Sequence, residues 1–579
     1  MKHKVIVLGL MATILLGLLL IWIGEARNGS GYRVVLIGID GGSWDIIRHL
    51  AAQNRIPNLQ SLMERGAAGY LDSVNWRTKT ERKTGYFSPV VWSSIATGKL
   101  PSKHGVEDFK LPVPSSMQFR MGYSRDDEPA YPDLGFPFNV RDRMSIVISA
   151  RAPNKLDHVD LQVFFNDRLL GTCALTTKFA PCRLTIEPNL VLWENNRLVF
   201  RYGESRSFGP NEVGADVEYI RIYNSEGAEI HDYAPSRDMA YFGEGWITEP
   251  PKEFALASSY HIRTRTLWEI LSSFNKRVAV VGWWATWPAY MINGYLVTSH
   301  VGLHGERREQ GKGSNNFLKT LPDLTYPDQL IDEIIPMYTP KEQLIPDFGR
   351  RFFEMGQCGC IGSRQEKIVL ERFWQDTFFS DIGQYLLDSK EKFDLFAIYF
   401  RGTDTMSHQF IGFAEDEELL KQECAGKPGC DLDRIHNALF NYYSYIDTQI
   451  GEIVKRSDRN TIFFVVTDHG EFAVGRKGTH KNNGFVISAG PGVRKYNYKH
   501  ASVLDIAPTI LYLLDLPVAQ DMDGKVLTEG FDRRLLLEKP LAFIDSYDRL
   551  VAGHSQKVIV DQKLEEQDTE ELKALGYIN

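Results

Sequence analysis

Short apolar runs rich in β-branched residues recur along the chain, and polar or turn-forming residues follow each of them. Runs of this length without alternation are typical of strands buried on both faces of a parallel sheet. They occupy residues 32–42, 276–284, 393–400, 460–470 and 484–492. Helical patterns at 262–274 and 439–456 stand between them. Strands that alternate with helices predict an α/β layered fold with a mainly parallel central sheet.

Residues 111–255 have a different pattern of apolar and polar residues. Short runs of alternating apolar and polar residues, such as SIVISARAP and ADVEYIRIYNS, are separated by Asn, Asp, Gly and Pro. This alternation, without a long helical pattern, predicts a jelly-roll-like β-sandwich domain inserted into the α/β region. The turn FNDRLLGT at 165–172 resembles a hairpin of galactose-binding-like sandwiches. Glycan binding therefore stays open beside a role as spacer or substrate gate.

Residues 5–23 form an apolar run without a charged side chain, and Lys2 and Lys4 precede it. About 20 apolar residues cross a bilayer, whereas the apolar region of a signal peptide usually has roughly 7–15. We therefore expect residues 1–27 to be a cytoplasmic tip and a transmembrane signal anchor, with a cleaved signal peptide as the alternative. By the positive-inside rule the rest of the chain lies outside the cytoplasm.

The cysteine count suits that compartment, because disulfides persist in oxidising surroundings. The six cysteines are Cys173, Cys182, Cys358, Cys360, Cys424 and Cys430. The simplest local pairs are Cys173–Cys182 and Cys424–Cys430, while two cysteines within the CGC at 358–360 rarely reach bridging geometry. The C-x-x-C pairs of a zinc knuckle are absent, so we expect disulfides and leave their connectivity open.

Composition narrows the class of protein. The chain has 579 residues, 43% of them hydrophobic and 24% charged, which indicates a globular protein of more than one domain. The net charge of −8 argues against nucleic acid as a partner, because phosphate backbones attract basic surfaces.

Acidic and histidine residues directly follow several predicted strands. They are Asp40, Asp404, His408, Asp468 and His469, with His480 in the nearby GTHKNNG. Sites of parallel sheets lie beyond the carboxyl ends of the strands, so we expect these side chains to converge. Carboxylates and imidazoles in this mixture suit Zn²⁺, with Mn²⁺ as an alternative, and they divide into two sets of ligands. Two such ions suit displacement at phosphorus by a serine or threonine alkoxide.

Six ordered motifs together resemble a known family. They are IGIDGG, FSPVVWSSIATGKLPSKHGV, GTDTMSH, VVTDHGE, GTHKNNGFVISAGPGV and LDIAPTILYLLDLPVAQDMDG. The set is similar to that of the type I phosphodiesterase/nucleotide pyrophosphatase branch of the alkaline phosphatase superfamily, over roughly 32–110 and 260–530. The resemblance implies an alkaline-phosphatase-like fold, with residues 28–110 and 256–530 as the two parts of a catalytic domain and 531–579 as a C-terminal tail.

The resemblance also assigns roles. The family's nucleophile lies ten residues before the glycine of the TG…P..HG signature, which implies Ser88 here, and leaves Ser93, Ser94 and Thr97 as packing or turn residues. One metal would be bound by Asp40, Ser88, Asp468 and His469, and the other by Asp404, His408 and His480. Ser88 would attack in line and form a covalent phosphoryl intermediate, which water or an acceptor hydroxyl releases.

One departure concerns substrate binding. Nucleotide pyrophosphatases carry an asparagine four positions after HG, where this chain has Phe109, so nucleotide specificity is not implied. Phe109, Lys110 and Trp284 are candidate substrate contacts, although the tryptophans of GWWATWP also suit a core. His300 and His304 are rival metal ligands that the family pattern does not use.

A sulfatase is not expected. The family of formylglycine sulfatases needs C/S-x-P-x-R, but Pro89 follows Ser88 directly and Trp92 stands in the arginine position. We therefore expect a membrane-anchored, extracytoplasmic, metal-dependent phosphodiesterase acting on a phosphate ester such as an envelope lipid or glycan. The alternatives are a phosphoethanolamine- or phosphoglycerol-type transferase and a non-catalytic glycan-binding surface protein. The last is disfavoured because no ligand or nucleophile is missing.

Overall fold

The structure is a computed structural model. It describes residues 31–548 apart from 79–83, 113–118, 122–129, 132–142, 154–155, 167, 191–197, 203–205, 209–210, 225–226, 228, 234–245, 249–253, 302–321, 389–391 and 483. No helix among these residues has the length and apolar character needed to span a membrane. The predicted anchor at 5–23, His304 and the tail beyond residue 548 lie outside the described residues.

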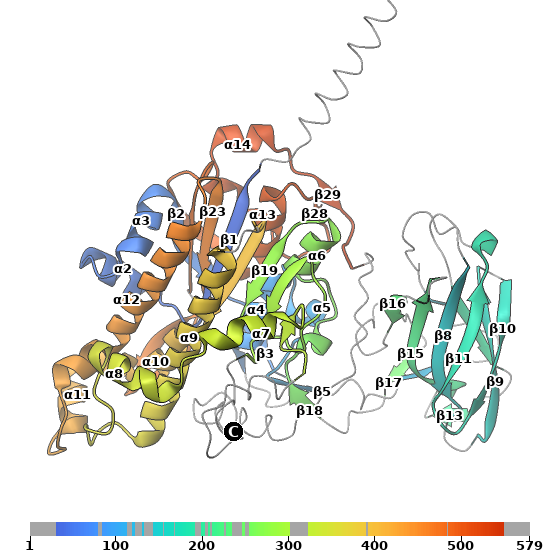
Figure 1. Ribbon diagram of the computed structural model, residues 1–579, viewed down its shortest axis with the longest axis horizontal. Helices are drawn as coiled ribbons and strands as arrows, with labels where there is room; N and C mark the ends of the chain where they lie inside the picture. Colours follow the sequence, from blue (N-terminus) through green and yellow to red (C-terminus); the bar gives the residue numbers. More distant parts are fainter. Residues whose placement is uncertain are drawn as a thin grey trace, which may run out of the picture.

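A nine-stranded mixed sheet forms the centre of the α/β region (Figure 1). Its strands are β1 (Arg33–Ile39), β2 (Ala67–Asp72), β19 (Val278–Val281), β20 (Gly294–Val297), β21 (Thr325–Tyr326), β22 (Leu395–Phe400), β23 (Thr461–Val466), β26 (Gly484–Ala489) and β27 (Tyr496–Ser502). They lie in the order β21-β20-β19-β22-β1-β23-β26-β2-β27. The run from β20 to β23 is parallel, whereas β26 is antiparallel to β23 and β2. The predicted α/β fold with a mainly parallel sheet is confirmed.

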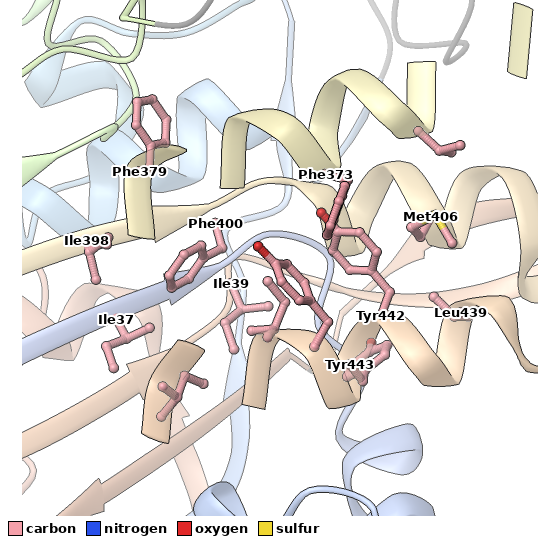
Figure 2. Close-up of a cluster of buried hydrophobic side chains, with 14 of the residues drawn as sticks. Ile37, Ile39, Phe373, Phe379, Ile398, Phe400, Met406, Leu439, Tyr442 and Tyr443 are labelled. Carbon is pink, nitrogen blue, oxygen red and sulfur yellow. The ribbon is translucent and has the colours of Figure 1, made fainter. Parts of the chain in front are cut away.

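Alternate residues of β1 belong to two hydrophobic clusters, one on each face of the sheet. Ile37 and Ile39 belong to the cluster that also includes α2 (Trp44–Ala52), α3 (Pro57–Arg65), α9 (Ser363–Asp388), α10 (Gly402–Glu415) and α12 (Leu432–Arg456). Val34 and Leu36 belong to the cluster with α4 (Ser88–Thr97), α6 (Leu267–Ser273) and α13 (Ile506–Leu513). Figure 2 shows part of the first cluster, where strand residues meet aromatic side chains of α9 and α12. Burial on both faces explains the continuous apolar runs of these strands.

Shorter elements complete the α/β region. The remaining helices are α5 (Pro101–His104), α7 (Leu330–Ile334), α8 (Lys341–Arg351), α11 (Glu417–Cys424) and α14 (Arg533–Glu538). Small two-stranded sheets pair β3 (Trp76–Arg77) with β4 (Thr84–Gly85), β24 (Gly470–Val474) with β25 (Lys477–Lys481), and β28 (Val518–Ala519) with β29 (Phe543–Ile544). The hairpin β24–β25 directly follows β23 at the carboxyl edge of the sheet.

Two further antiparallel sheets form between residues 119 and 248. One contains β6 (Phe119–Met121), β8 (Met144–Arg151), β11 (Ala180–Ile186), β15 (Ala215–Tyr223), β16 (Glu229–Tyr233) and β17 (Trp246–Thr248). The other contains β7 (Ala130–Tyr131), β9 (His158–Phe165), β10 (Arg168–Thr176) and β12 (Leu198–Tyr202). A separate pair joins β13 (Arg206–Phe208) and β14 (Asn211–Val213). Both larger sheets contribute to one hydrophobic cluster, which includes Ile148, Leu161 and Ile220.

The chain enters and leaves this part at neighbouring points. The strand β5 (Lys110–Pro112) pairs antiparallel with β18 (Phe254–Leu256). This pairing puts residue 110 beside residue 256, close to the boundaries that the change of sequence rhythm predicts.

The cysteine pairing differs in part from the simplest local pairs. Cys173–Cys182 is confirmed, with a Cα–Cα distance of 5.8 Å. The pair Cys424–Cys430 is wrong, because the structure joins Cys358 to Cys430 and Cys360 to Cys424. The fold brings the turn before α9 against the loop between α11 and α12, so distant cysteines are closer partners than local ones. Sequence spacing does not report that packing.

Candidate active site

The six metal-ligand candidates converge at the carboxyl edge of the sheet. Asp40 follows β1, Asp404 lies in the first turn of α10 after β22, and Asp468 and His469 follow β23. One group of possible ligands is Asp40, Asp468 and His469, and a second is Asp404, His408, Glu471 and His480. Within each group the ligand atoms all lie within 4.8 Å of one another. All six predicted residues are therefore brought together, and Glu471 joins them.

The two groups adjoin each other. His469 Nε2 lies 3.2 Å from Asp468 Oδ2 and 3.6 Å from Asp40 Oδ1 in its own group. The same nitrogen lies 3.9 Å from Asp404 Oδ1 of the second group. The His469 ring also stacks on that of His480, with 3.7 Å between the ring centroids. The carboxylates and imidazoles thus form one continuous buried cluster rather than two separate sites.

Each histidine of the cluster has its Nδ1 beside a backbone carbonyl, which can only accept. His408 Nδ1 donates to Gly478 O at 3.1 Å, His480 Nδ1 to Tyr86 O at 2.6 Å and His469 Nδ1 to Gly470 O at 3.3 Å. In the neutral imidazole these bonds assign the proton to Nδ1 and make Nε2 the ligand atom. His408 Nε2 and His480 Nε2 lie 3.0 Å apart and at 3.4 and 3.5 Å from Asp404 Oδ1, so three possible ligand atoms of one cation lie together.

Helix α10 is held in place where it begins. Asp376 of α9 accepts hydrogen bonds from Arg401 N and Gly402 N, both at 2.9 Å, and from Tyr442 Oη at 2.8 Å. A carboxylate at a helix N-terminus satisfies otherwise unpaired N–H groups and the helix dipole. This contact fixes the first turn of α10, from which Asp404 and His408 face the cluster at i and i+4.

Ser88 is the first residue of α4 and meets the cluster directly. Its Oγ donates to Asp40 Oδ1 at 3.2 Å, and the side chain is buried. The N-terminal end of a helix favours negative charge, as an alkoxide or a phosphate oxygen would carry. Tyr399 Oη of β22 donates to the other Asp40 oxygen, Oδ2, and so fixes the carboxylate that accepts from Ser88.

The other hydroxyls of the same stretch face backbone groups. Ser93 Oγ donates to Pro89 O at 2.7 Å, and Thr97 Oγ1 donates to Ser93 O at 2.8 Å. Ser94 Oγ donates to a carbonyl one turn back and lies 2.9 Å from His104 Nε2. Among these four hydroxyls of the described α4, Ser88 is the one that donates to a carboxylate of the cluster.

Burial makes the carboxylates costly to ionise without cations. Burial, and then repulsion from Asp404, raises the pKa of Asp40 to about 6. Burial and the neighbouring aspartates likewise raise the pKa of Asp468 well above its usual range. Burial also opposes ionisation of Asp404, but the facing His408 and His480 outweigh it and hold its pKa low. Cations would relieve this repulsion, and oxygen and nitrogen donors in this mixture fit divalent zinc or manganese.

Glu471 is the ligand candidate that the sequence prediction omits. It follows the Asp-His-Gly of the VVTDHGE motif and is the second residue of β24. The side chain is 1% exposed, whereas the next residue, Phe472, is 41% exposed. The sequence shows an acidic residue next to an aromatic residue. It does not show which of the two faces inward, because that depends on the strand register.

The substrate candidates Phe109 and Trp284 form an aromatic wall with Phe87, the residue before Ser88. Phe109 is buried against Phe87, with 5.9 Å between ring centroids, and Trp284 is 6.5 Å from Phe109. The Trp284 indole donates to Tyr399 Oη at 2.7 Å, and its ring lies 4.6 Å below the guanidinium of Arg401. The wall therefore ends in a cation that the sequence prediction did not name.

The remaining candidates differ in position. Lys110 opens β5 next to Phe109 and is half-buried. Trp283 and Trp287 of the same tryptophan-rich stretch are buried in the two hydrophobic clusters. His300 stacks on Trp287, with 4.6 Å between ring centroids, and belongs to neither group of possible ligands.

A family comparison agrees with the motifs. The model of the type I phosphodiesterase/nucleotide pyrophosphatase family matches residues 34–153 and 223–503, more than half of the 579 residues. The segment between the two matches falls within the two antiparallel sheets described above. The resemblance predicted from the ordered motifs is therefore confirmed.

Individual relatives are more distant. Arylsulfatase K of Gallus gallus is 30% identical over 136 residues, which is 21% of this chain and 23% of that relative. Among solved structures, wild-type alkaline phosphatase PafA is 10% identical with a TM-score of 0.40, and the match covers 87% of this chain and 100% of that one. Murine ectonucleotide pyrophosphatase/phosphodiesterase 5 is 8% identical with a TM-score of 0.36 and coverage of 86% and 100%.

Proposed function

The chain belongs to the type I phosphodiesterase/nucleotide pyrophosphatase family, and on that premise we propose that it is a metal-dependent phosphodiesterase with Ser88 as its nucleophile. The observation that carries the proposal is the contact of Ser88 Oγ with Asp40, inside a buried cluster of carboxylates and imidazoles. A hydroxyl at a helix N-terminus with an acceptor carboxylate 3.2 Å away is suited to lose its proton.

The chain's own residues account for the principal steps. Asp40, Asp468 and His469 would hold one divalent ion with Ser88, and Asp404, His408 and His480 the other. Ions bound there would lower the pKa of the Ser88 hydroxyl and offset the charge of the phosphoryl oxygens. Ser88 Oγ attacks phosphorus in line and the bond to the leaving alcohol breaks. Water then cleaves the phosphoseryl ester, so that one diester and one water give a monoester and an alcohol.

The aromatic wall would contact the substrate. Phe109 and Trp284 offer apolar surface beside Ser88, and Lys110 or Arg401 offers a positive charge. Phe109 carries no side-chain hydrogen-bond donor, so it cannot replace the asparagine that nucleotide pyrophosphatases have at this position. We expect broad recognition of the ester group rather than recognition of a nucleotide.

Location is part of the proposal. Residues 5–23 would anchor the chain in a membrane, with the catalytic domain outside the cytoplasm. The charges of Lys2 and Lys4 support the orientation, and the disulfides support an oxidising compartment. Residues 111–255 would form an inserted β-sandwich domain that lies over or beside the substrate. Alkaline extraction of membranes, followed by protease treatment of intact cells, tests both the anchor and its orientation.

The reaction class is tested with a panel of chromogenic esters. We expect the detergent-solubilised full chain, loaded with Zn²⁺ or Mn²⁺, to hydrolyse a phosphodiester faster than the matching monoester and to leave the sulfate ester intact. Chelation should abolish turnover, and the added ion should restore it. Faster turnover of the sulfate ester would overturn the proposal. Transfer of the phosphoryl group to an added glycan hydroxyl, with little hydrolysis, would favour the transferase alternative.

A further inference from the structure

Glu471 is a buried carboxylate without the usual means of compensating its charge. It is 1% exposed, and neither carboxyl oxygen meets a hydrogen-bond donor among the described residues. A buried ionised carboxylate without a partner costs several kcal/mol, so native structures pair such groups or bind a cation to them. Glu471 therefore needs an explanation that its protein neighbours do not supply.

The backbone leaves space for this carboxylate. Gly41 lies next to the carboxylate and has φ +63°. A Cβ built there would collide with Glu471 Oε1. A Cβ built at Gly478, on the facing strand β25, would collide with Glu471 Oε2. Two glycines on opposite sides thus make room for both oxygens. This space places the Glu471 carboxylate beside Asp404, and the negative charges of the two groups repel each other.

The position of Glu471 within the cluster indicates which side chains could bind an ion together with it. Its ligand oxygen lies within 4.8 Å of those of Asp404, His408 and His480, and β24 pairs Glu471 directly with His480 of β25. His408 Nε2 and His480 Nε2 lie 3.0 Å apart in the same space. Four possible ligand atoms this close together can bind one ion.

We propose that Glu471 is a fourth protein ligand of the divalent ion held by Asp404, His408 and His480, an inference that rests on the proposed two-metal function. With Glu471 the cluster contains four carboxylates, Asp40, Asp404, Asp468 and Glu471, against the four positive charges of two divalent ions. The loaded site is then close to neutral before Ser88 ionises. A neutral site accepts a phosphodiester monoanion with less repulsion than a phosphomonoester dianion, so Glu471 also favours diesters.

The test is metal binding by the full chain carrying Glu471→Gln. Titration of the metal-free protein with Zn²⁺ or Mn²⁺ should show one ion bound about 10–100-fold more weakly than in the wild type, with the other ion unchanged. Glu366→Gln is the matched control, because Glu366 is also buried but accepts a hydrogen bond from Gly356 N at 2.7 Å, away from the cluster. Two ions bound with wild-type affinity by Glu471→Gln would overturn the inference.

Thermal unfolding separates a ligand from a structural carboxylate. If Glu471 binds the ion, Glu471→Gln does not lower the melting temperature of the metal-free protein, because neither carboxyl oxygen has a hydrogen-bond donor to lose, and it reduces the rise that metal produces. A structural role would instead lower the melting temperature in both states. If the glutamine variant does not fold, Glu471→Asp provides the same titration.

Specificity gives a third readout. Among variants that still turn over, the ratio of kcat/KM for the monoester to that for the diester should rise in Glu471→Gln and stay constant in Glu366→Gln. The metal titration does not depend on turnover. A chain that binds two ions through Glu471 but hydrolyses no ester would therefore refute the proposed function while leaving this inference intact.

Discussion

Arg401 carries a guanidinium for which the structure shows no carboxylate partner among the described residues. It lies 4.6 Å above the Trp284 ring, and its positive charge acts on Asp40. A half-buried arginine at the end of an aromatic wall suits an anionic ester oxygen, since planar guanidinium groups pair well with phosphate.

We therefore expect Arg401→Gln to raise KM for a phosphodiester about tenfold or more, the cost of a hydrogen bond to a charged group, with kcat less affected. Steady-state kinetics measures both constants. Arg401→Lys should recover part of the loss, because the charge remains. An unchanged KM in the glutamine variant would remove Arg401 from the substrate site.

The burial of His104 predicts how the free energy of unfolding depends on pH. It is fully buried, its Nε2 lies 2.9 Å from Ser94 Oγ, and its Nδ1 accepts from Val106 N at 3.2 Å. Burial lowers the pKa of His104 to about 3, whereas an unfolded histidine has a pKa of about 6.5. Between these values only the unfolded chain binds the proton, so stability is complete above about 6.5 and falls as the pH is lowered.

The expected slope is about 1.4 kcal/mol of unfolding free energy per pH unit below 6.5. Denaturant unfolding of the wild type and of His104→Gln at several pH values between about 7.5 and 5 measures it. The variant should lack this share of the pH dependence. Identical slopes in the two proteins would show that His104 is charged or hydrated in the folded state.

At the scale of elements, Lys99 follows α4 and forms ion pairs with the C-terminal part of the chain. Its side chain is 3% exposed, and Nζ lies 2.7 Å from Asp521 Oδ2 and 2.6 Å from Asp548 Oδ2. Breaking a fully buried pair typically costs roughly 3–5 kcal/mol. Asp521 and Asp548 are 33% and 22% exposed, so water can replace part of the interaction once the lysine is removed.

We expect Lys99→Met to destabilise the fold by about 2 kcal/mol in denaturant unfolding, measured at neutral pH. Lys103→Met is the control, because Lys103 is 44% exposed in its pair with Asp523 and should contribute less than about 1 kcal/mol. Equal effects of the two substitutions would contradict the account of Lys99 as a buried tie.

The elements also explain which site residues the sequence could reveal. Asp40, Asp404 and Asp468 were predicted because each follows an apolar strand, and the ends of parallel strands meet at one edge of the sheet. Glu471 was not predicted, because it is the second residue of a hairpin strand and the register of that strand determines whether its side chain faces inward or outward. Arg401 follows β22 directly, but one arginine in a chain with 66 lysines and arginines carries no signal without its aromatic neighbour.

At the scale of the whole molecule, three disulfides join segments that differ greatly in sequence separation. Cys360–Cys424 closes a separation of 64 residues and Cys173–Cys182 one of 9. The fold class was predictable because strand and helix patterns are local. The pairing of Cys358, Cys360, Cys424 and Cys430 was not, because it depends on how the turn before α9 packs on the loop between α11 and α12.

Chain entropy predicts a larger cost for opening the long loops than the short one. Replacing all four cysteines of the nested bridges Cys358–Cys430 and Cys360–Cys424 by serine should cost about 4 kcal/mol or more, and replacing both of Cys173–Cys182 about 3 kcal/mol. The first replacement should also reduce turnover, because Cys360 O accepts from Arg476, at the tip of the β24–β25 hairpin. The second should leave turnover unchanged, as its bridge lies in the antiparallel sheets. Unfolding curves and ester hydrolysis on the same samples decide both points.

The most direct test of the central claim compares single-hydroxyl variants within α4. Phosphodiester turnover by the metal-loaded full chain is measured for the wild type, Ser88→Ala and Ser93→Ala, after metal content confirms that each protein is loaded. The account predicts that Ser88→Ala loses activity by several orders of magnitude, while Ser93→Ala, whose hydroxyl donates to Pro89 O, keeps most of it. Wild-type turnover by loaded Ser88→Ala would contradict a serine nucleophile at this position.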